Sequence, residues 1–187
     1  MRKTDSVSFG NATAAWMAIF ALCSVVNAQD PSTWSQHRGN AGSTGVSADD
    51  SVKPPLRMVW SYRCDSDTAG DAGAGLTVGG GKVFCNMAMT RSVLSLDAKT
   101  GAFCWEFFHH DVHYMQTSSY DDGKLFVWLR GYGRSALVAL NADTGKIIWE
   151  KKLGSTKGVI ARRSGPAITD GKVLVADSEG RRETRSD

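Results

Sequence analysis

The stretch SLDAKTGAFCW, Ser95–Trp105, is echoed by ALNADTGKIIW at Ala139–Trp149. Both copies place an Asp or Asn, a Thr-Gly pair and a Trp at the same offsets. A second marker keeps the same order, with GGKVF at 80–84, DGKLF at 122–126 and DGKVL at 170–174. Trp60 extends the first series, because it lies 45 residues before Trp105, and Trp149 lies 44 after it. Two independent markers with similar periods indicate an internal repeat.

Each repeat is predicted to contain four short strands bounded by Gly, Asp and Asn turns. In the second repeat these strands are expected at 117–120, 124–129, 136–140 and 147–151, and in the first at 75–78, 82–86, 92–96 and 104–107. No segment carries a long apolar stripe at helical spacing. The sequence therefore predicts an all-β fold, a β-propeller of four-stranded antiparallel blades.

The residues shared by the two copies have predicted structural roles. The Asp or Asn can cap its turn by accepting bonds from the backbone two residues on, and the Thr can do so more weakly. The Gly takes a positive φ, and the Trp is large enough to cover the gap between neighbouring blades. We expect the turn and blade docking to depend on Asp97, Thr100, Gly101 and Trp105 in the first copy, and on Asn141, Thr144, Gly145 and Trp149 in the second.

The pattern Ala/Ser-x-Asp/Asn-x-x-Thr-Gly-x-x-x-Trp resembles the tryptophan-docking motif of pyrroloquinoline-quinone (PQQ)-type β-propeller repeats. The resemblance covers about residues 56–177. The stretch WSQHRGNAGSTG, Trp34–Gly45, is similar to the W-x-Q-x-R-G lead-in of exported bacterial PQQ-like propeller proteins, although Ser35 and His37 stand where those lead-ins often carry Pro and an aromatic residue. The rival WD40 and kelch families match less well, since no Trp precedes an Asp and the glycine run 79–81 precedes a strand.

The resemblance implies two classes of function. The family includes quinoprotein dehydrogenases, which oxidise alcohols or sugars with PQQ and Ca2+, and non-catalytic members such as the propeller lipoprotein of the outer-membrane β-barrel assembly machine. The catalytic centre of the dehydrogenases includes adjacent cysteines, and none of the four cysteines here has a cysteine neighbour. We therefore assign no catalytic or cofactor-binding residue and expect a non-catalytic binding or scaffold module without a cofactor. The alternative is a fragment of a PQQ-dependent alcohol or sugar dehydrogenase, which would need PQQ and Ca2+.

The N-terminus has the pattern of an export signal. Arg2 and Lys3 precede the apolar run 12–26, and Val26-Asn27-Ala28 predicts cleavage after Ala28. The apolar run is shorter than the roughly 20 residues that span a bilayer, so a retained anchor is the alternative. We expect a signal peptide at 1–28, a lead-in at 29–55, a partial propeller at 56–187, a periplasmic or secreted location and no membrane span after cleavage.

The blade count is predicted to fall short of a ring. Residues 71–107 and 117–153 form two blades, and a third begins at Gly165, giving about two and a half, whereas PQQ-like propellers resemble rings of about seven or eight blades. An open arc leaves strand edges exposed. We expect a truncated gene product or a fragment, and the alternative is a short arc completed by a partner chain.

Candidate chemistry gathers on the predicted loops. His109, His110 and His113 are candidate metal ligands, with solvated loop residues as the alternative reading. Their loop is expected to share a ring face with Arg130–Arg134 and with 153–165, a face suited to a protein or polymer partner, anionic in character. The formal net charge is only +3, and no basic track is interleaved with aromatics, so no nucleic-acid partner is expected. Cysteines at 64, 85 and 104 follow no zinc spacing, and their pairing stays open.

Overall fold

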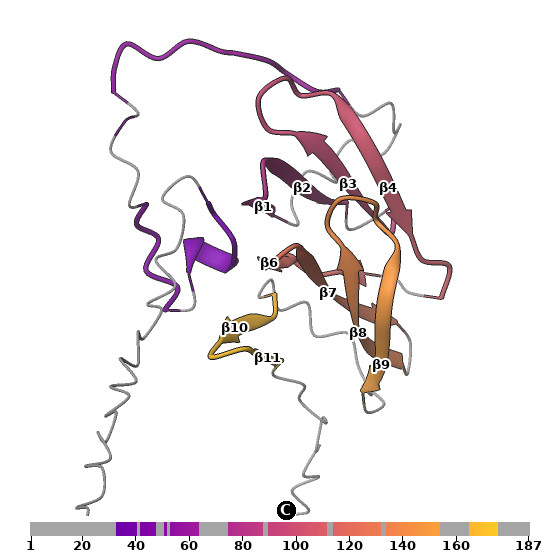
Figure 1. Ribbon diagram of the computed structural model, residues 1–187. Coiled ribbons are helices and arrows are strands. Elements are labelled where there is room, and N and C mark those ends of the chain that lie inside the picture. Colours follow the sequence, from indigo (N-terminus) through magenta and orange to yellow (C-terminus); the bar gives the residue numbers. More distant parts are fainter. Residues whose placement is uncertain are drawn as a thin grey trace, which may run out of the picture.

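In the computed structural model, the described part of the chain contains two antiparallel sheets and a separate hairpin (Figure 1). The structure describes residues 33–40, 42–47, 51, 53–63, 75–87, 90–111, 114–131, 134–153 and 165–175. The predicted signal peptide at 1–28 and Cys64 lie outside these residues. Within the part described, no helix is long and apolar enough to cross a membrane.

The strands follow the predicted order. The first sheet contains β1 (Leu76–Gly79), β2 (Lys82–Met87), β3 (Ser92–Asp97) and β4 (Phe103–Phe108), the second contains β5 (Tyr114–Met115), β6 (Ser119–Asp121), β7 (Lys124–Gly131), β8 (Arg134–Asn141) and β9 (Ile147–Leu153), and the hairpin contains β10 (Ala167–Thr169) and β11 (Lys172–Leu174). The first sheet runs from β1 to β4 in chain order, and in the second both β5 and β6 pair with β7, which is followed by β8 and β9. A short 3-10 turn, η1 (His37–Gly39), precedes them. The prediction of an all-β chain built from four-stranded antiparallel units is confirmed.

The Gly-Lys markers are the hairpin turns between the first two strands of each unit. Asp122 and Gly123 have φ of 42° and 71°, and Asp170 and Gly171 have φ of 49° and 67°. Two consecutive positive φ values define a type I′ turn, whose twist matches that of the flanking strands. The sequence marker therefore recurs because each unit needs the same turn.

The two sheets also repeat in register. The pairing of β3 with β4 shifts between Ser95 and Leu96, and that of β8 with β9 shifts between Ala139 and Leu140. These irregularities place Trp105 opposite Ser95 and Trp149 opposite Ala139. Ser95 and Ala139 are therefore equivalent positions in the two units.

One strand differs from the prediction. The sequence reading treated the region up to residue 116 as a loop, but β5 pairs with the far end of β7, so the inner strand of the second sheet is split. The split has a polar cause. The buried Asn86 side chain donates to the carbonyl of Gln116 at 2.7 Å and accepts from the N–H of Ser118 at 3.3 Å. A buried amide needs such partners, and these backbone groups provide them.

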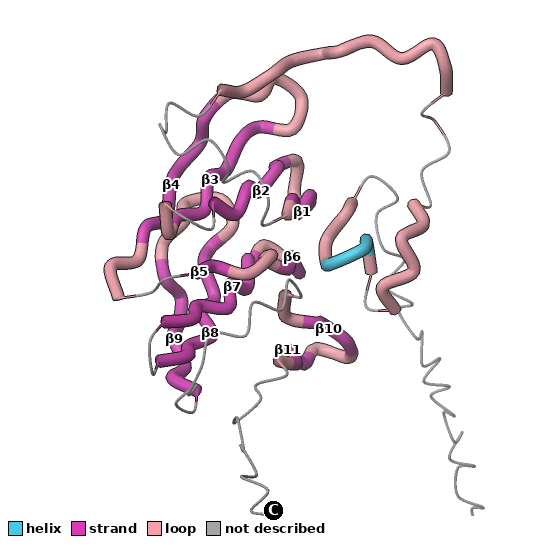
Figure 2. The backbone as a smooth tube through the Cα atoms, turned by 180° about the vertical axis from the view of Figure 1, so that it is seen from behind, coloured by secondary structure: helices cyan, strands magenta, loops and turns pink. Residues whose placement is uncertain are grey.

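The sheets are layered like neighbouring blades. Alternate residues of β7 enter two different apolar clusters, because Leu125 and Val127 pack towards the first sheet while Phe126 and Trp128 pack with Ile168 of the hairpin. Figure 2 shows β1, β6 and β10 following one another along one side of the array, with β4 and β9 on the opposite side. We call the side formed by β1, β6 and β10 the inner edge.

Candidate functional site

The repeated turn is held by one side-chain oxygen in each copy. Asp97 Oδ1 accepts from the N–H of Lys99 at 3.0 Å, and from the N–H and hydroxyl of Thr100 at 2.8 Å each. Asn141 Oδ1 accepts the three equivalent bonds at 2.9 to 3.0 Å. The Thr100 hydroxyl, and then its N–H, hold the pKa of Asp97 below its ordinary value, against a smaller opposing effect of burial. The carboxylate of Asp97 and the amide of Asn141 thus cap their turns with the same three hydrogen bonds.

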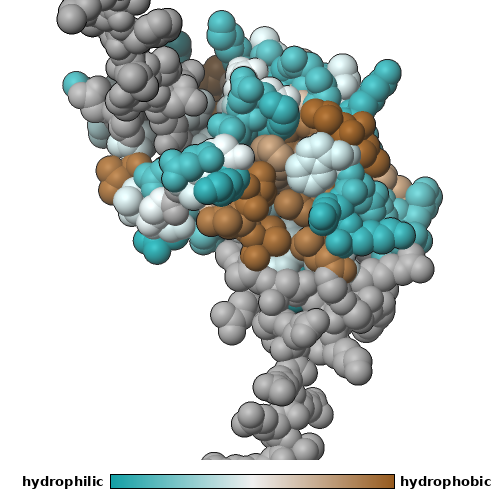
Figure 3. All heavy atoms as spheres, turned by 60° about the horizontal axis from the view of Figure 1, so that its bottom comes forward, coloured by the Kyte–Doolittle hydropathy of each residue, from teal (hydrophilic) through white to brown (hydrophobic). Residues whose placement is uncertain are grey.

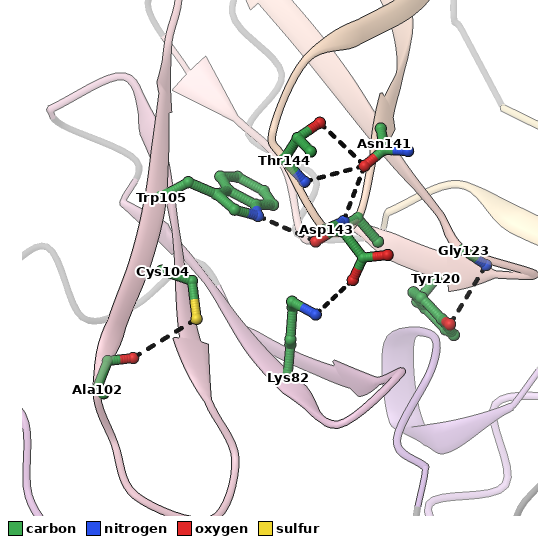
Figure 4. A network of polar contacts seen from close by, with 10 residues as sticks. Lys82, Ala102, Cys104, Trp105, Tyr120, Gly123, Asn141, Asp143 and Thr144 are labelled. Carbon is green, nitrogen blue, oxygen red and sulfur yellow. Dashed lines mark hydrogen bonds and ion pairs between the residues drawn. The ribbon is translucent and has the colours of Figure 1, made fainter.

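The tryptophan of the first sheet sits on the turn of the second. Trp105 Nε1 donates to the carbonyl of Ala142 at 3.0 Å, as Figure 4 shows. Gly145 has φ of 70°, and a Cβ built there would lie 2.7 Å from the Trp105 ring. Glycine is therefore required twice at this position, by the backbone conformation and by the indole above it.

The same contact occurs one repeat earlier. Trp60 Nε1 donates to the carbonyl of Ala98 at 3.0 Å, and a Cβ at Gly101 would lie 2.7 Å from the Trp60 ring. The indoles of Trp60 and Trp105 therefore each dock on the turn of the repeat that follows. Trp149, the next in the series, packs against Phe126 of its own sheet with ring centroids 5.9 Å apart. Its side chain is 39% exposed, whereas Trp105 is 8% exposed.

Other apolar residues of β9 and β11 are exposed as well as Trp149. Ile147 and Ile148 on β9 are about half exposed, as is Leu174 on β11. Apolar side chains gather on the face turned forward in Figure 3, which is the lower side of the array in Figure 1.

An ion pair between Lys82 and Asp143 also joins the two sheets, with 2.5 Å between Lys82 Nζ and Asp143 Oδ1. Because the Asp143 side chain is largely solvated, the pair contributes little to stability.

A buried polar seam joins the inner strands of the two sheets. Thr77 Oγ1 donates to the carbonyl of Ser118 at 2.7 Å, and Ser118 Oγ donates to Asn86 Oδ1 at 2.8 Å. Among the described residues, Ser95 Oγ is the one buried side-chain polar atom without a hydrogen-bond partner. The buried polar side chains of the seam therefore form their hydrogen bonds within the chain, without a ligand.

The lead-in runs along the inner edge and pairs with successive units. Trp34 exchanges two backbone hydrogen bonds with Val78 of β1, at 2.9 and 3.1 Å. The next residue, Ser35, accepts from the N–H of Tyr120 in β6 at 2.7 Å. Consecutive residues of the lead-in therefore contact consecutive units of the repeat.

Gln36 continues the series with its side chain. Its Oε1 accepts from the N–H of Ile168 in β10 at 2.7 Å, and its Nε2 donates to the carbonyl of Ile168 at 3.1 Å. A side-chain amide carries one acceptor and donors at the spacing of a peptide group. Gln36 thus pairs with β10 as one residue of a neighbouring strand would.

The two described histidines of the predicted metal cluster pack on different rings. The ring centroid of His109 lies 6.3 Å from that of Phe107, and His110 meets Phe108 edge-on at 4.7 Å. His113 lies outside the described residues. Over the part of the chain that is described, no three His, Cys, Asp or Glu side chains gather as a metal site.

Basic side chains lie at the strand ends on the predicted loop face. The Arg91 guanidinium lies 5.6 Å from the Phe108 ring centroid, and that of Arg130 lies 4.8 Å from the Trp128 ring. Arg130 is nearly buried, while Lys151 and Lys152 at the end of β9 are exposed. The pair of Arg91 and Phe108 presents a cation beside a partly exposed ring.

Comparison with known proteins identifies the repeat. A family model described as "Outer membrane protein assembly factor BamB" (PQQ_2) matches residues 91–185, which is more than half of the chain. The chain belongs to the PQQ-like β-propeller repeat family. The fold and the tryptophan-docking resemblance seen in the sequence agree with this membership.

Relatives of this PQQ-like chain are much longer than it is. A polyvinylalcohol dehydrogenase from Pseudomonas sp is 30% identical over 135 residues, covering 68% of this chain and 20% of that protein. A quinoprotein ethanol dehydrogenase from Pseudomonas aeruginosa is 29% identical over 149 residues, covering 72% and 23%. The solved structure of a europium-containing methanol dehydrogenase matches 80% of this chain and 28% of its own, at 22% identity and a TM-score of 0.58. The last likeness shows the fold alone.

Within this PQQ-like chain, sequence reasoning identified the lead-in by likeness and missed what its residues contact. Gly39, at φ 95°, packs under the Trp34 ring, with a built Cβ 3.1 Å from it. The Arg38 carbonyl accepts from the N–H of Gly45 at 2.8 Å, and its guanidinium lies over Gly45. The W-x-Q-x-R-G residues thus each have a contact, but the partners of Trp34 and Gln36 lie too far along the chain for a local signal to reveal them.

Proposed function

We propose that the chain is an exported, non-catalytic PQQ-like propeller module that binds or scaffolds a partner. The observation that carries this proposal is the filled inner edge. The lead-in pairs with β1, β6 and β10, and the polar seam behind it is satisfied within the chain. A surface whose hydrogen-bonding groups are already paired offers little to a small polar ligand.

The described residues do not suit the quinone and Ca2+ that the family resemblance raises. A cofactor cradle would leave buried donors or acceptors aimed into it, yet Ser95 Oγ, the one such atom described, lies on β3 among the packed strands rather than on the inner edge. No two cysteines are adjacent in the sequence. The described residues therefore support no proposed reaction with PQQ in this chain.

The partner is proposed to meet the loop face. Arg91 presents its guanidinium beside the Phe108 ring, and Lys151 and Lys152 are exposed at the same ends of the strands. Basic side chains at these strand ends, one of them beside an apolar ring, favour a polymer or protein that carries negative charge. The family description names an outer-membrane assembly factor, which supports a periplasmic or secreted location together with the predicted signal peptide.

The alternative is a fragment of a PQQ-dependent dehydrogenase. It is favoured by the relatives of the chain, which include a polyvinylalcohol dehydrogenase and a quinoprotein ethanol dehydrogenase. Because the chain spans about a fifth of their length, shared blades do not carry their activities with them.

Reconstitution distinguishes the two proposals. The full chain is mixed with PQQ and Ca2+, binding is followed by isothermal titration calorimetry, and dye-linked oxidation of ethanol and glucose is assayed in parallel. We expect neither saturable binding nor oxidation. Stoichiometric PQQ binding would overturn the non-catalytic proposal even without turnover, because it would show a formed cofactor site.

A further inference from the structure

We propose that Gln36 is a strap that holds the β10–β11 hairpin against the rest of the chain, and that its release lets this hairpin open while the two larger sheets stay folded. The proposal concerns a conformational device and does not depend on the partner or cofactor. It rests on the paired hydrogen bonds between the Gln36 side chain and Ile168.

The hairpin needs such support. Among the described residues it is a two-stranded sheet, and an isolated two-stranded hairpin is marginally stable at best in water. Thr169, Lys172 and Leu174 are exposed, so few of its side chains are buried. Ile168, at 7% exposure, is its main apolar anchor.

Two other contacts hold the base of the hairpin. The Ser119 hydroxyl donates to the carbonyl of Pro166, and Ile168 packs among Phe126, Trp128 and Leu137. Gln36 adds two bonds to the backbone of Ile168, on the edge of β10 that does not face β11.

Gln36 is held ready for this pairing. The two residues before it are fixed by backbone bonds to β1 and β6, and its own carbonyl accepts from the N–H of Gly39 at 2.9 Å. The side chain therefore loses little further freedom when it binds Ile168, because the backbone on both sides is already ordered. Opening would uncover Phe126, Trp128 and Leu137, next to the partly exposed Trp149, whose ring packs against that of Phe126.

Hydrogen–deuterium exchange on the full chain tests the strap. Gln36→Ala removes both bonds and is expected to raise the opening of the β10–β11 amides on the order of tenfold, with β2 and β3 unchanged. Asn40→Ala is the matched control, because it removes an equivalent amide whose bonds stay within the lead-in, to Thr44. The control should leave all three regions as they are.

A second variant separates the strap from general damage. Gln36→Glu keeps the acceptor but cannot donate to the Ile168 carbonyl while ionised, so at neutral pH the hairpin should exchange faster than in the unsubstituted chain. Below about pH 4.3, the ordinary pKa of Glu, the protonated carboxyl can donate again, and the ratio to the unsubstituted chain at the same pH should fall back towards one. Unchanged exchange in Gln36→Ala, equal acceleration in β2 and β3, or no recovery of Gln36→Glu at low pH would each overturn the proposal.

Discussion

The docking of Trp105 on the neighbouring turn can be measured by comparing two glycine substitutions. Gly145→Ala and Gly123→Ala both place a methyl group at a positive φ, 70° and 71° respectively. A Cβ at Gly145 would meet the Trp105 ring at 2.7 Å, whereas a Cβ at Gly123 would have no heavy atom within 4 Å. Both substitutions therefore carry a similar backbone strain energy. The difference between their free energies of unfolding reports the clash with the Trp105 indole.

The expected magnitude follows from these contacts. In both variants the left-handed backbone costs about 1–2 kcal/mol, offset by about 0.4–1 kcal/mol because alanine restricts the unfolded chain. Gly145→Ala also forces the ring away, at about 1–3 kcal/mol for overpacking, and weakens the bond from Trp105 to Ala142, at about 1 kcal/mol. The free energy of unfolding should fall by about 2–4 kcal/mol more for Gly145→Ala than for Gly123→Ala.

Urea unfolding followed by far-UV circular dichroism provides the measurement. The midpoints are compared once equal slopes show that both variants expose the same surface on unfolding. If the two variants agree within about 0.5 kcal/mol, a difference typical of unrelated surface sites, the indole is not seated on the turn and the docking argument fails.

Three further predictions concern the same repeat. Trp105→Ala should cost about 3–5 kcal/mol as a buried aromatic truncation, and Trp149→Ala less than half as much because Trp149 is 39% exposed; equal losses in thermal or urea unfolding would contradict this. Ser95→Ala should stabilise the chain by about 1 kcal/mol, because it removes a buried hydroxyl that has no hydrogen-bond partner, and a lower urea midpoint would show that this hydroxyl is bonded. The pKa of Asp97 is lowered in the folded chain by the turn threonine, so its stabilisation is present above the ordinary Asp pKa of about 3.9 and is lost as the pH falls through the lower folded value. Asp97→Asn should keep the turn, as Asn141 does, and flatten the loss of stability on the acid side; an unchanged pH profile between about pH 6 and 2 would refute this.

Much of the fold was predictable because its signals are local. The Asx, Thr and Gly of each turn contact one another within five residues, and strand lengths follow from the spacing of these turns. The predicted strands agree with the observed ones to within about three residues at their ends. The split inner strand was missed because it depends on Asn86, which lies 30 residues before its partner Gln116.

The candidate site was less predictable. Of the three histidines named as candidate metal ligands, His109 and His110 pack on Phe107 and Phe108 of β4, two successive residues whose side chains point to opposite faces. Sequence spacing alone could not show this, because it gives no direction to the side chains at a strand end. His113 lies outside the described residues, so the metal site stays a prediction.

The sequence by itself determined the repeat, the turn chemistry and the requirement for glycine at a positive φ, because these depend on backbone sterics and on bonds between near neighbours. Only the tertiary structure decided which residues far apart in the sequence contact one another. Trp105 docks 37 residues ahead, on Ala142, and Gln36 pairs 132 residues ahead, on Ile168. Such contacts are set by how one sheet is rotated against the next, which no local pattern records.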